Sequence, residues 1–188
     1  MSAGIDREKA LALLRQHVAD PRILKHSLAS EAVLRALAAR LGEDPDVWGI
    51  AGLLHDIDIE ITQADPAVHG SRSAPILEAN GVEPEVVAAI RRHNRLSTTE
   101  PRQSRLDHAL AAGETITGLI VSTALILPDK KLASVKAKSV AKRIKDDRFA
   151  SSVNRETIRE CEEIGIDTAE FAGIALVAMQ GVSDELDL

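Results

Sequence analysis

The chain has 188 residues, a length that fits one domain with a sizeable hydrophobic core. Hydrophobic residues make up 45% and charged residues 28%, which excludes a largely disordered chain. Aromatic residues make up only 2%, so a β-sandwich or barrel is disfavoured and helix packed on helix is favoured. The net charge of −6 argues against broad nucleic-acid binding, although a local basic patch is compatible with it.

Helix start and stop signals recur along the whole chain. Gly42 ends one helix as a C-terminal cap, Pro45 and Pro84 each open another, and Pro128 stops the longest. In chain order we expect helices over about residues 6–18, 22–41, 45–57, one that begins at about 69 and closes at 80–81, then 84–94, 104–127, 133–145, 154–163 and 168–181. No alternating run predicts a strand, and no linker is long enough to divide two domains. The sequence therefore predicts a single all-α domain.

Cysteine content and apolar runs indicate the surroundings of the protein. Its one cysteine, Cys161, forms no internal disulfide, so stability must come from packing, with a metal as a second candidate source. The first ten residues are polar and acidic, which predicts no secretory signal. The most apolar stretch, residues 110–127, is interrupted by Glu114 and four hydroxyl side chains, so it predicts a buried helix and no membrane span. We expect a cytoplasmic protein.

Two segments of the C-terminal third leave alternatives open. The Lys- and Arg-rich run over 130–145 is typical of a solvated helix face, and its other reading is a rim that attracts a polyanionic substrate. The apolar helix expected over 168–181 is either part of the core or the interface of a homo-oligomer.

The histidines lie at positions that matter more than their number. His26 and His93 each continue an apolar stripe at helical spacing, which directs both toward the core. His55 and Asp56 end an apolar run that contains two glycines, and glycine permits a close approach of backbones. His69 follows a turn and begins the next helical segment.

A lone inward histidine is most often a core residue with a hydrogen-bond partner. Several inward histidines with an adjacent Asp, expected on four separate helices, favour a different interpretation. Converging imidazoles and carboxylates need a cation to offset their desolvation, and both are usual ligands of divalent metals. The pattern therefore predicts a metal site in the core of a helical bundle.

The order of these motifs resembles the HD-domain superfamily of metal-dependent phosphohydrolases. The resemblance rests on His26, the run GLLHDID over 52–58, His69-Gly70 and His93-Asn94, an H…HD…H…H arrangement. The runs TGLIV and PDKKL, over 117–121 and 128–132, are also similar to one bacterial subset of uncharacterised HD hydrolases. The resemblance covers about residues 22–180. It implies a single HD-type helical domain over 1–188, with a metal-binding core over about 22–127 and C-terminal helices over 133–181.

Glu114 departs from the pattern of the family, which has Asp at this position. Its carboxylate extends one methylene farther from the backbone, and a metal–oxygen bond tolerates only about ±0.2 Å. Either the helix backbone lies farther from the metal, or the Glu114 side chain adopts a bent conformation, or the occupancy of the metal falls. Gly113 and Gly118 leave room for the backbone to shift. Glu114 shares a helical face with Leu110 and Val121, which points inward, and the alternative is a surface pair with an arginine.

The resemblance implies six metal ligands, which are His26, His55, Asp56, His69, His93 and Glu114. The first three and Glu114 would hold one divalent cation, and Asp56 would bridge to a second one held by His69 and His93. Without a second ion, His69 or His93 would contact phosphate or donate a proton. The mixed nitrogen and oxygen donors suit Mn, Fe, Co, Ni or Zn and do not choose among them.

Two further residues, and His93 in a second role, are candidates for roles around the metal. Asp58 and His93 are candidate catalytic groups, with Asp58 as a proton shuttle; the alternative for Asp58 is a carboxylate that faces solvent. Arg72, three residues after His69, is the candidate for binding the phosphate of the substrate.

The sequence thus predicts a metal-dependent hydrolase of a phosphoester, a nucleotide or another small phosphorylated metabolite, that uses metal-activated water. Two alternatives stay open. One is an HD-fold regulatory protein that binds metal or nucleotide with weak turnover, indicated by Glu114. The other is a di-iron oxygenase, because a minority of HD-domain proteins use a di-iron pair for oxidative cleavage. Trp48 is the main candidate for stacking on a base, so we expect recognition to rest mainly on phosphate and metal.

Overall fold

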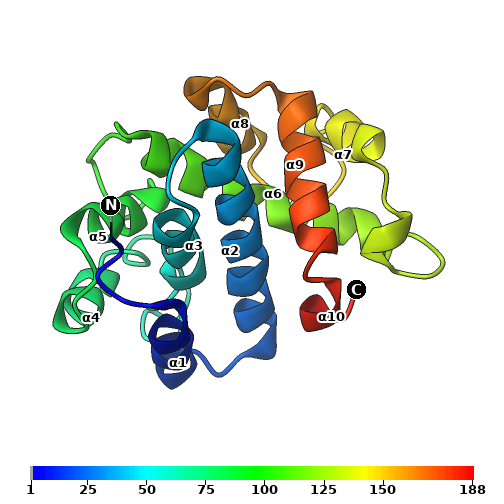
Figure 1. The fold of residues 1–188 in the computed structure, drawn as a ribbon. Coiled ribbons are helices and arrows are strands. Elements are labelled where there is room, and N and C mark those ends of the chain that lie inside the picture. Colours follow the sequence, from blue (N-terminus) through cyan, green and yellow to red (C-terminus); the bar gives the residue numbers. More distant parts are fainter. Residues whose placement is uncertain (1) are drawn as a thin grey trace.

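Figure 1 shows the computed structural model of the protein, which describes residues 2–188. Its helices are α1 (Arg7–His17), α2 (Pro21–Leu41), α3 (Pro45–Leu54), α4 (Ser73–Ala79), α5 (Pro84–His93), α6 (Arg105–Leu125), η1 (Leu132–Ser134), α7 (Ala137–Ile144), α8 (Arg155–Arg159), η2 (Glu160–Ile164), α9 (Thr168–Gln180) and α10 (Ser183–Leu186). Residues 2–188 contain no strand, so the prediction of an all-α fold is confirmed. None of these helices has the length and apolarity that crossing a membrane requires.

The two 21-residue helices α2 and α6 form the centre of the fold. Helix α2 packs against α3, α6 and α9, and α6 also contacts α5, α7 and α8. In Figure 1, α2 stands between α3 and α9 while α6 crosses behind them. Their facing side chains, such as Leu34 and Leu37 of α2 and Leu110 and Ile116 of α6, are fully buried. This core fixes the helices that carry the polar groups described below.

Two glycines bring three helices close together where the polar cluster lies. A Cβ on Gly52 of α3 would lie 2.7 Å from the carbonyl oxygen of Ser30, so α3 rests directly on the backbone of α2. A Cβ on Gly113 of α6 would lie 2.6 Å from a methyl group of Leu34. Because Ser30 is one turn after His26, and Gly113 precedes Glu114, both close contacts lie beside expected metal ligands.

Helix α3 ends earlier than the sequence predicts. It stops at Leu54 rather than near residue 57, and residues 55–72 form a series of turns before α4. His69 therefore lies in a turn and not at the start of a helix, which corrects the expectation of four helices. At the turn of His69 the Asp58 carboxylate, 12 and 14 residues earlier in the chain, accepts the backbone N–H groups of Gly70 and Arg72, which helical pairing would have used.

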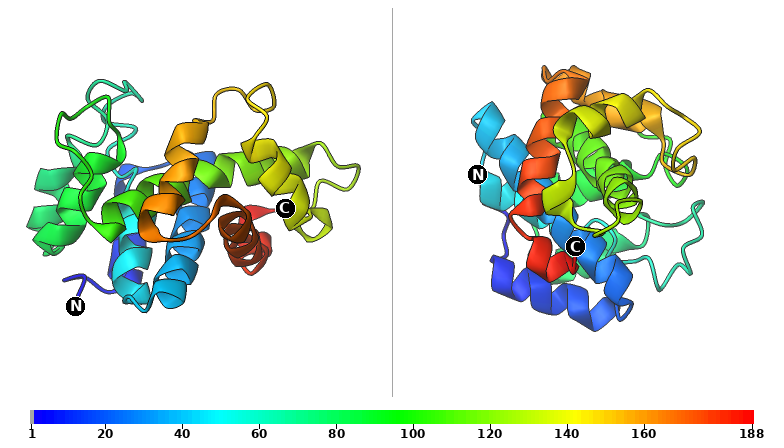
Figure 2. Two further views of the ribbon diagram at one scale, coloured as in Figure 1. Left: turned by 90° about the horizontal axis from the view of Figure 1, so that it is seen from above. Right: turned by 90° about the vertical axis from the view of Figure 1, so that its right-hand side faces the viewer.

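The C-terminal third also differs in detail from the expected helices. The regions expected as helices over 133–145 and 154–163 are each divided, into η1 with α7 and α8 with η2. Both views in Figure 2 place the 146–153 loop on the same face of the molecule as the turns of residues 55–72. Helix α9 packs on α2 and α7 and buries Phe171 and Met179, so its apolar face belongs to the core.

Candidate metal centre

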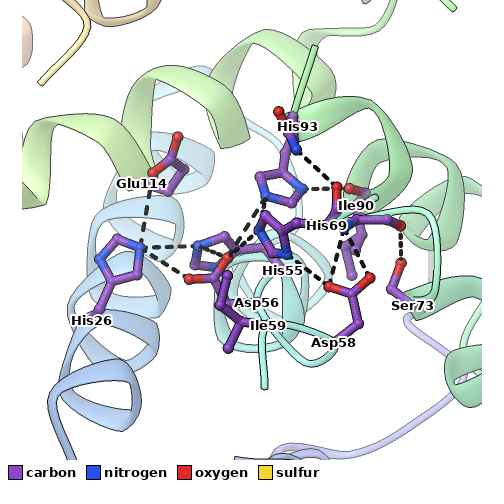
Figure 3. Close-up of polar contacts among 12 residues, drawn as sticks. His26, His55, Asp56, Asp58, Ile59, His69, Ser73, Ile90, His93 and Glu114 are labelled. Carbon is purple, nitrogen blue, oxygen red and sulfur yellow. Dashed lines mark hydrogen bonds and ion pairs between the residues drawn. The ribbon is translucent and has the colours of Figure 1, made fainter. Parts of the chain in front are cut away.

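Five elements bring the six expected metal ligands together (Figure 3). They are His26 from α2, His55 and Asp56 just after α3, His69 from the turns, His93 at the end of α5 and Glu114 from α6. Their donor atoms form two groups, each with atoms within 4.8 Å of one another: His26, His55 and Glu114, and Asp56, His69 and His93. The cluster is compatible with a metal site.

Asp56 lies between the two groups. Its Oδ1 atom is 2.9 Å from Nε2 of His69 and 3.3 Å from Nε2 of His55, while Oδ2 is 3.6 Å from Nε2 of His26. Glu114 lies on the opposite side, with Oε2 3.8 Å from Nε2 of His26. One carboxylate therefore faces imidazoles of both groups, an arrangement suited to bridging two cations.

All four imidazole rings are held by Nδ1, which leaves Nε2 pointing into the cluster. Nδ1–H of His55 donates to the carbonyl oxygen of Gly52 at 2.8 Å, and that of His93 donates to the carbonyl oxygen of Ile90 at 2.6 Å. His26 Nδ1 donates to the Thr117 hydroxyl at 3.0 Å, because that hydroxyl itself donates to the backbone carbonyl of Glu114.

Opposed Nε2 atoms make a cation the natural occupant of this cluster. The Nε2 atoms of His26 and His55 are 3.1 Å apart, and so are those of His69 and His93. Two ring lone pairs at this distance repel each other unless a proton or a cation lies between them. Rings anchored by Nδ1, with Nε2 free, are how proteins present histidine to a metal. The donor set therefore fits one or two divalent ions.

The pKa values of three of these histidines make two of them neutral and one charged. Burial lowers the pKa of His55 to about 3 and that of His93 to about 4, so both are neutral at pH 7. Burial also opposes the charged form of His69, but hydrogen bonds with Asp56 and Asp58 outweigh it and raise its pKa to about 9.

The two carboxylates of the cluster differ in the same way. Burial raises the pKa of Glu114 to about 8, and the nearby Asp56 charge adds to this, so Glu114 is mostly protonated at pH 7. Burial works against ionised Asp56 too, but His55 and His69 hold its pKa well below its usual range. A divalent cation among these groups would displace the protons on Glu114 and His69.

Asp58 is fully buried and lies at the Nδ1 edge of the His69 ring, while Asp56 lies at its Nε2 edge (Figure 3). Oδ1 of Asp58 accepts from His69 Nδ1 at 2.8 Å, and its Oδ2 accepts from the backbone N–H groups of Gly70 at 2.8 Å and Arg72 at 2.9 Å. The alternative of a solvent-facing carboxylate is therefore wrong. Both oxygens are engaged in holding the His69 ring and the turn that carries it.

An open pocket of about 500 Å³, the metal pocket, lies over the cluster. Five of the six ligands line it, together with Arg95 and Arg102 from the segment between α5 and α6. The Arg72 side chain is exposed and does not line it; only its backbone N–H reaches the cluster, through Asp58. Neither Arg95 nor Arg102 was singled out from the sequence, because the 94–104 segment has no periodic pattern to place them.

The two arginines differ in their surroundings. The Arg102 side chain is 4% exposed, pairs with Glu160 and donates to the carbonyl oxygens of Arg92 and His93. Burial lowers its pKa from the usual value for arginine. Arg95 is exposed, and within residues 2–188 it makes no ion pair or hydrogen bond through its side chain. The pocket thus has one fixed cation at its wall and one free cation at its mouth.

The opposite wall of the metal pocket comes from the C-terminal third, through residues 152–154 and Thr157. Buried Arg155 holds this loop by donating to the carbonyl oxygens of Ala150 at 2.8 Å and Val153 at 2.6 Å. Trp48 does not take part, since it is 4% exposed and lines a different cavity beside Gly42. Trp48, which the sequence suggested for stacking on a base, therefore does not line the metal pocket.

An all-α fold with a buried cluster of histidines and carboxylates defines a helical protein suited to binding metal. The family model of the HD domain matches residues 23–126, which is 104 of the 188 residues. The chain therefore belongs to the HD-domain family, whose members are mostly metal-dependent hydrolases. No curated protein and no solved structure matches the chain.

Proposed function

We propose that the protein is a metal-dependent phosphohydrolase that cleaves the ester bond of a small phosphorylated molecule in the metal pocket. One observation carries the proposal: four Nδ1-anchored imidazoles and two carboxylates converge at the base of an open pocket walled by two arginines. Divalent cations bound there would supply water activation near neutral pH and positive charge against the phosphoryl oxygens.

The ligands divide between two cations in this proposal. His26, His55 and Glu114 would hold one, His69 and His93 would hold the other, and Asp56, which faces both groups, would serve as a ligand to either. The donors suit Mn, Fe, Co, Ni or Zn. His93 has its Nδ1 engaged by a carbonyl oxygen and its Nε2 directed at His69, so we assign it as a ligand; proton donation by His93 applies to a form with a single ion.

The remaining residues bind the substrate and position the ligands. Arg102 and Arg95 bind phosphoryl oxygens, in place of Arg72, because they line the pocket and Arg72 does not. Arg102 donates three of its five N–H groups to other groups of the protein, which leaves two N–H donors for a phosphate. Asp58 orients His69, in place of the proton transfer expected from the sequence, because both of its oxygens already accept hydrogen bonds.

The test combines metal analysis with a hydrolysis screen. The protein is loaded in turn with Mn²⁺, Fe²⁺, Co²⁺, Ni²⁺, Zn²⁺ and Mg²⁺ and assayed on phosphomonoesters, phosphodiesters and nucleotides. We expect metal-dependent phosphate release, and Asp56→Asn should lower kcat/KM on the order of 10³-fold with loss of bound metal. Asp147→Asn is the matched control, because Asp147 is exposed and its side chain has no partner in residues 2–188.

Other outcomes would replace the proposal. Unchanged metal content in Asp56→Asn would show that the cluster does not bind the ions. Two irons per chain with an oxygen-dependent optical change, and no phosphate release, would indicate a di-iron oxygenase. Full metal binding without hydrolysis of any substrate would indicate a regulatory protein, and Glu114→Asp would then test whether the longer side chain is the cause.

A further inference from the structure

A second cavity of about 440 Å³ adjoins the metal pocket. We call it the aliphatic groove, after the side chains that line it: Ala29, Val121, Leu125, Leu186 and Leu188. His26 and Gly118 line both cavities, so the two share a boundary. No Phe or Trp is among the described residues that line either one. The metal pocket therefore continues into a surface that is apolar but offers no ring for stacking.

One face of α6 leads from the metal ligands to the far end of the groove. Glu114, Gly118, Val121 and Leu125 follow at spacings of four, three and four residues, which keeps them on one side of a helix. At about 1.5 Å per residue, Leu125 lies roughly 16 Å from Glu114 along the axis. Leu125 is 48% exposed, so this apolar face remains open to a ligand.

Gly118 keeps the boundary between the cavities open. A Cβ at this position would lie no closer than 3.5 Å to another atom, the Cγ2 of Val153, which is an ordinary contact. Packing therefore does not require glycine here, unlike at Gly113, where a Cβ would meet Leu34 at 2.6 Å. Glycine inside a helix is also less favourable than alanine. What glycine provides at this position is space between the metal pocket and the groove.

The charges at the edge of the groove do not make it a second anion site. Lys25 pairs with Asp187 at 2.5 Å, and Arg22 pairs with Asp20 at 2.7 Å. Each cation therefore already has a carboxylate partner, in contrast to Arg95 at the mouth of the metal pocket. The occupant that matches the groove is uncharged and aliphatic.

We propose that the aliphatic groove binds the alkyl part of the substrate, which makes the substrate a phosphoester of an aliphatic alcohol. The inference rests on the proposed function. The phosphate lies over the metal ligands, and the chain passes Gly118 toward Leu125. In the reaction, a water oxygen forms a bond to phosphorus and the bond from phosphorus to the alkoxy oxygen breaks. The protons of the water are shared between the products, an alcohol and inorganic phosphate.

Alkylphosphonates test the groove without turnover, because their carbon–phosphorus bond is not hydrolysed. Methyl-, butyl- and octylphosphonate are titrated calorimetrically into the Mn²⁺-loaded protein. We expect affinity to rise about twofold to fourfold for each added CH₂ until the groove is filled. Equal affinities for the methyl and octyl compounds would overturn the inference, and so would tighter binding of a nucleoside monophosphate than of octylphosphonate.

Two variants locate the alkyl chain. Gly118→Leu fills the boundary and should bring the octyl-to-methyl affinity ratio close to one. Gly173→Leu is the matched control, because Gly173 lies inside α9 with nothing within 4 Å of its added Cβ, and it should leave the ratio unchanged. Leu125→Glu places a charge at the exposed end and should lower the ratio about tenfold, which keeps the test available if Gly118→Leu does not fold. An unchanged ratio in a folded groove variant would overturn the inference.

The experiment also separates this inference from the function on which it rests. If removal of metal by a chelator leaves methylphosphonate binding unchanged, the proposed phosphohydrolase site is wrong, whatever the chain length does. If short phosphoesters are hydrolysed with metal but chain length has no effect on binding, the phosphohydrolase stands and the aliphatic groove as a subsite is wrong.

Discussion

Residues 23–126 and residues 127–188 contribute different kinds of side chain to the same pocket. The first region, which the HD-domain family model matches, carries all six converging ligands and both arginines. The second region carries the polar wall at residues 152–154, Glu160 as the ion-pair partner of Arg102, and two leucines of the aliphatic groove. The groups suited to metal chemistry thus all come from the first region, whereas groups that line the surroundings of the substrate come from both regions.

The two regions also hold their groups by different means. All ligands except His69 project from, or directly follow, helices with buried contacts, such as α3, where every residue from Val47 to Leu54 is buried. The 146–153 loop has no fully buried residue; Phe149, Ala150 and Val153 pack partly buried against the core, and the guanidinium of Arg155 donates to the loop's carbonyl oxygens. Because none of the ligands lies on this loop, substrate preference can change there without disturbing them.

The largest expected effect comes from the loss of a metal ligand in the first region. His55→Gln removes a fully buried donor and should weaken metal binding by more than about 100-fold, with a loss of hydrolysis on the order of 10³-fold. Metal analysis of the purified variant and phosphate release measure this. His17→Gln, in α1 and away from the cluster, is the control. Equal metal content in the two variants would contradict the assignment of His55.

Metal binding should depend steeply on pH. In the metal-free protein Glu114 and His69, with pKa values of about 8 and 9, carry protons at pH 7, while His55 and His93, at about 3 and 4, do not. Cations would displace the protons on Glu114 and His69, so these two groups alone should make the product of the two binding constants rise about 100-fold from pH 6 to pH 7, with the rise ending above pH 9.

Calorimetry in buffers of different ionisation enthalpy measures this release directly. We expect about two protons per pair of cations at pH 7, and about one in Glu114→Gln. No release at pH 7 would mean that Glu114 and His69 are not displaced by the ions, and the ligand set would have to be revised.

Asp58→Asn should have a smaller effect than the loss of a ligand. An amide group cannot accept all three hydrogen bonds that the carboxylate receives, so the His69 ring loses its fixed orientation. We expect metal affinity to fall roughly 10- to 100-fold, with the cation bound through His69 affected more than the other. If hydrolysis falls while metal affinity at both positions holds, Asp58 transfers protons, as the sequence suggested.

The smallest expected effect concerns the wall from the C-terminal third. Thr157→Val keeps the shape of the side chain but removes a hydroxyl group that lines the pocket. If that hydroxyl binds substrate, KM should rise about fivefold, as expected for one hydrogen bond, with kcat and metal content unchanged. A fall in metal content would contradict the division of labour between the two regions.

Much of the fold follows from local signals in the sequence. Pro45 and Pro84 open helices where expected, Gly42 adopts a left-handed conformation at the end of α2, and Ser104 with Asp107 forms a capping box at the start of α6. These signals act within one helical turn, so they can be read without knowledge of the tertiary structure. The turns around His69 could not, because there the Asp58 carboxylate accepts the backbone N–H groups of Gly70 and Arg72, which lie 12 and 14 residues farther along the chain.

The sequence by itself determined the all-α class and the order of the helices, and helical periodicity directs His26, His93 and Glu114 inward. The full set of six converging residues came from the resemblance of the motifs to the HD-domain family. Only the tertiary structure decided that Asp58 holds His69, because its partners lie 11 to 14 residues away in turns without periodicity. It likewise decided that Arg102 and not Arg72 reaches the pocket, and that Gly118 separates two cavities. Such contacts depend on which irregular segments pack side by side, and the spacing of residues along the chain does not predict that packing.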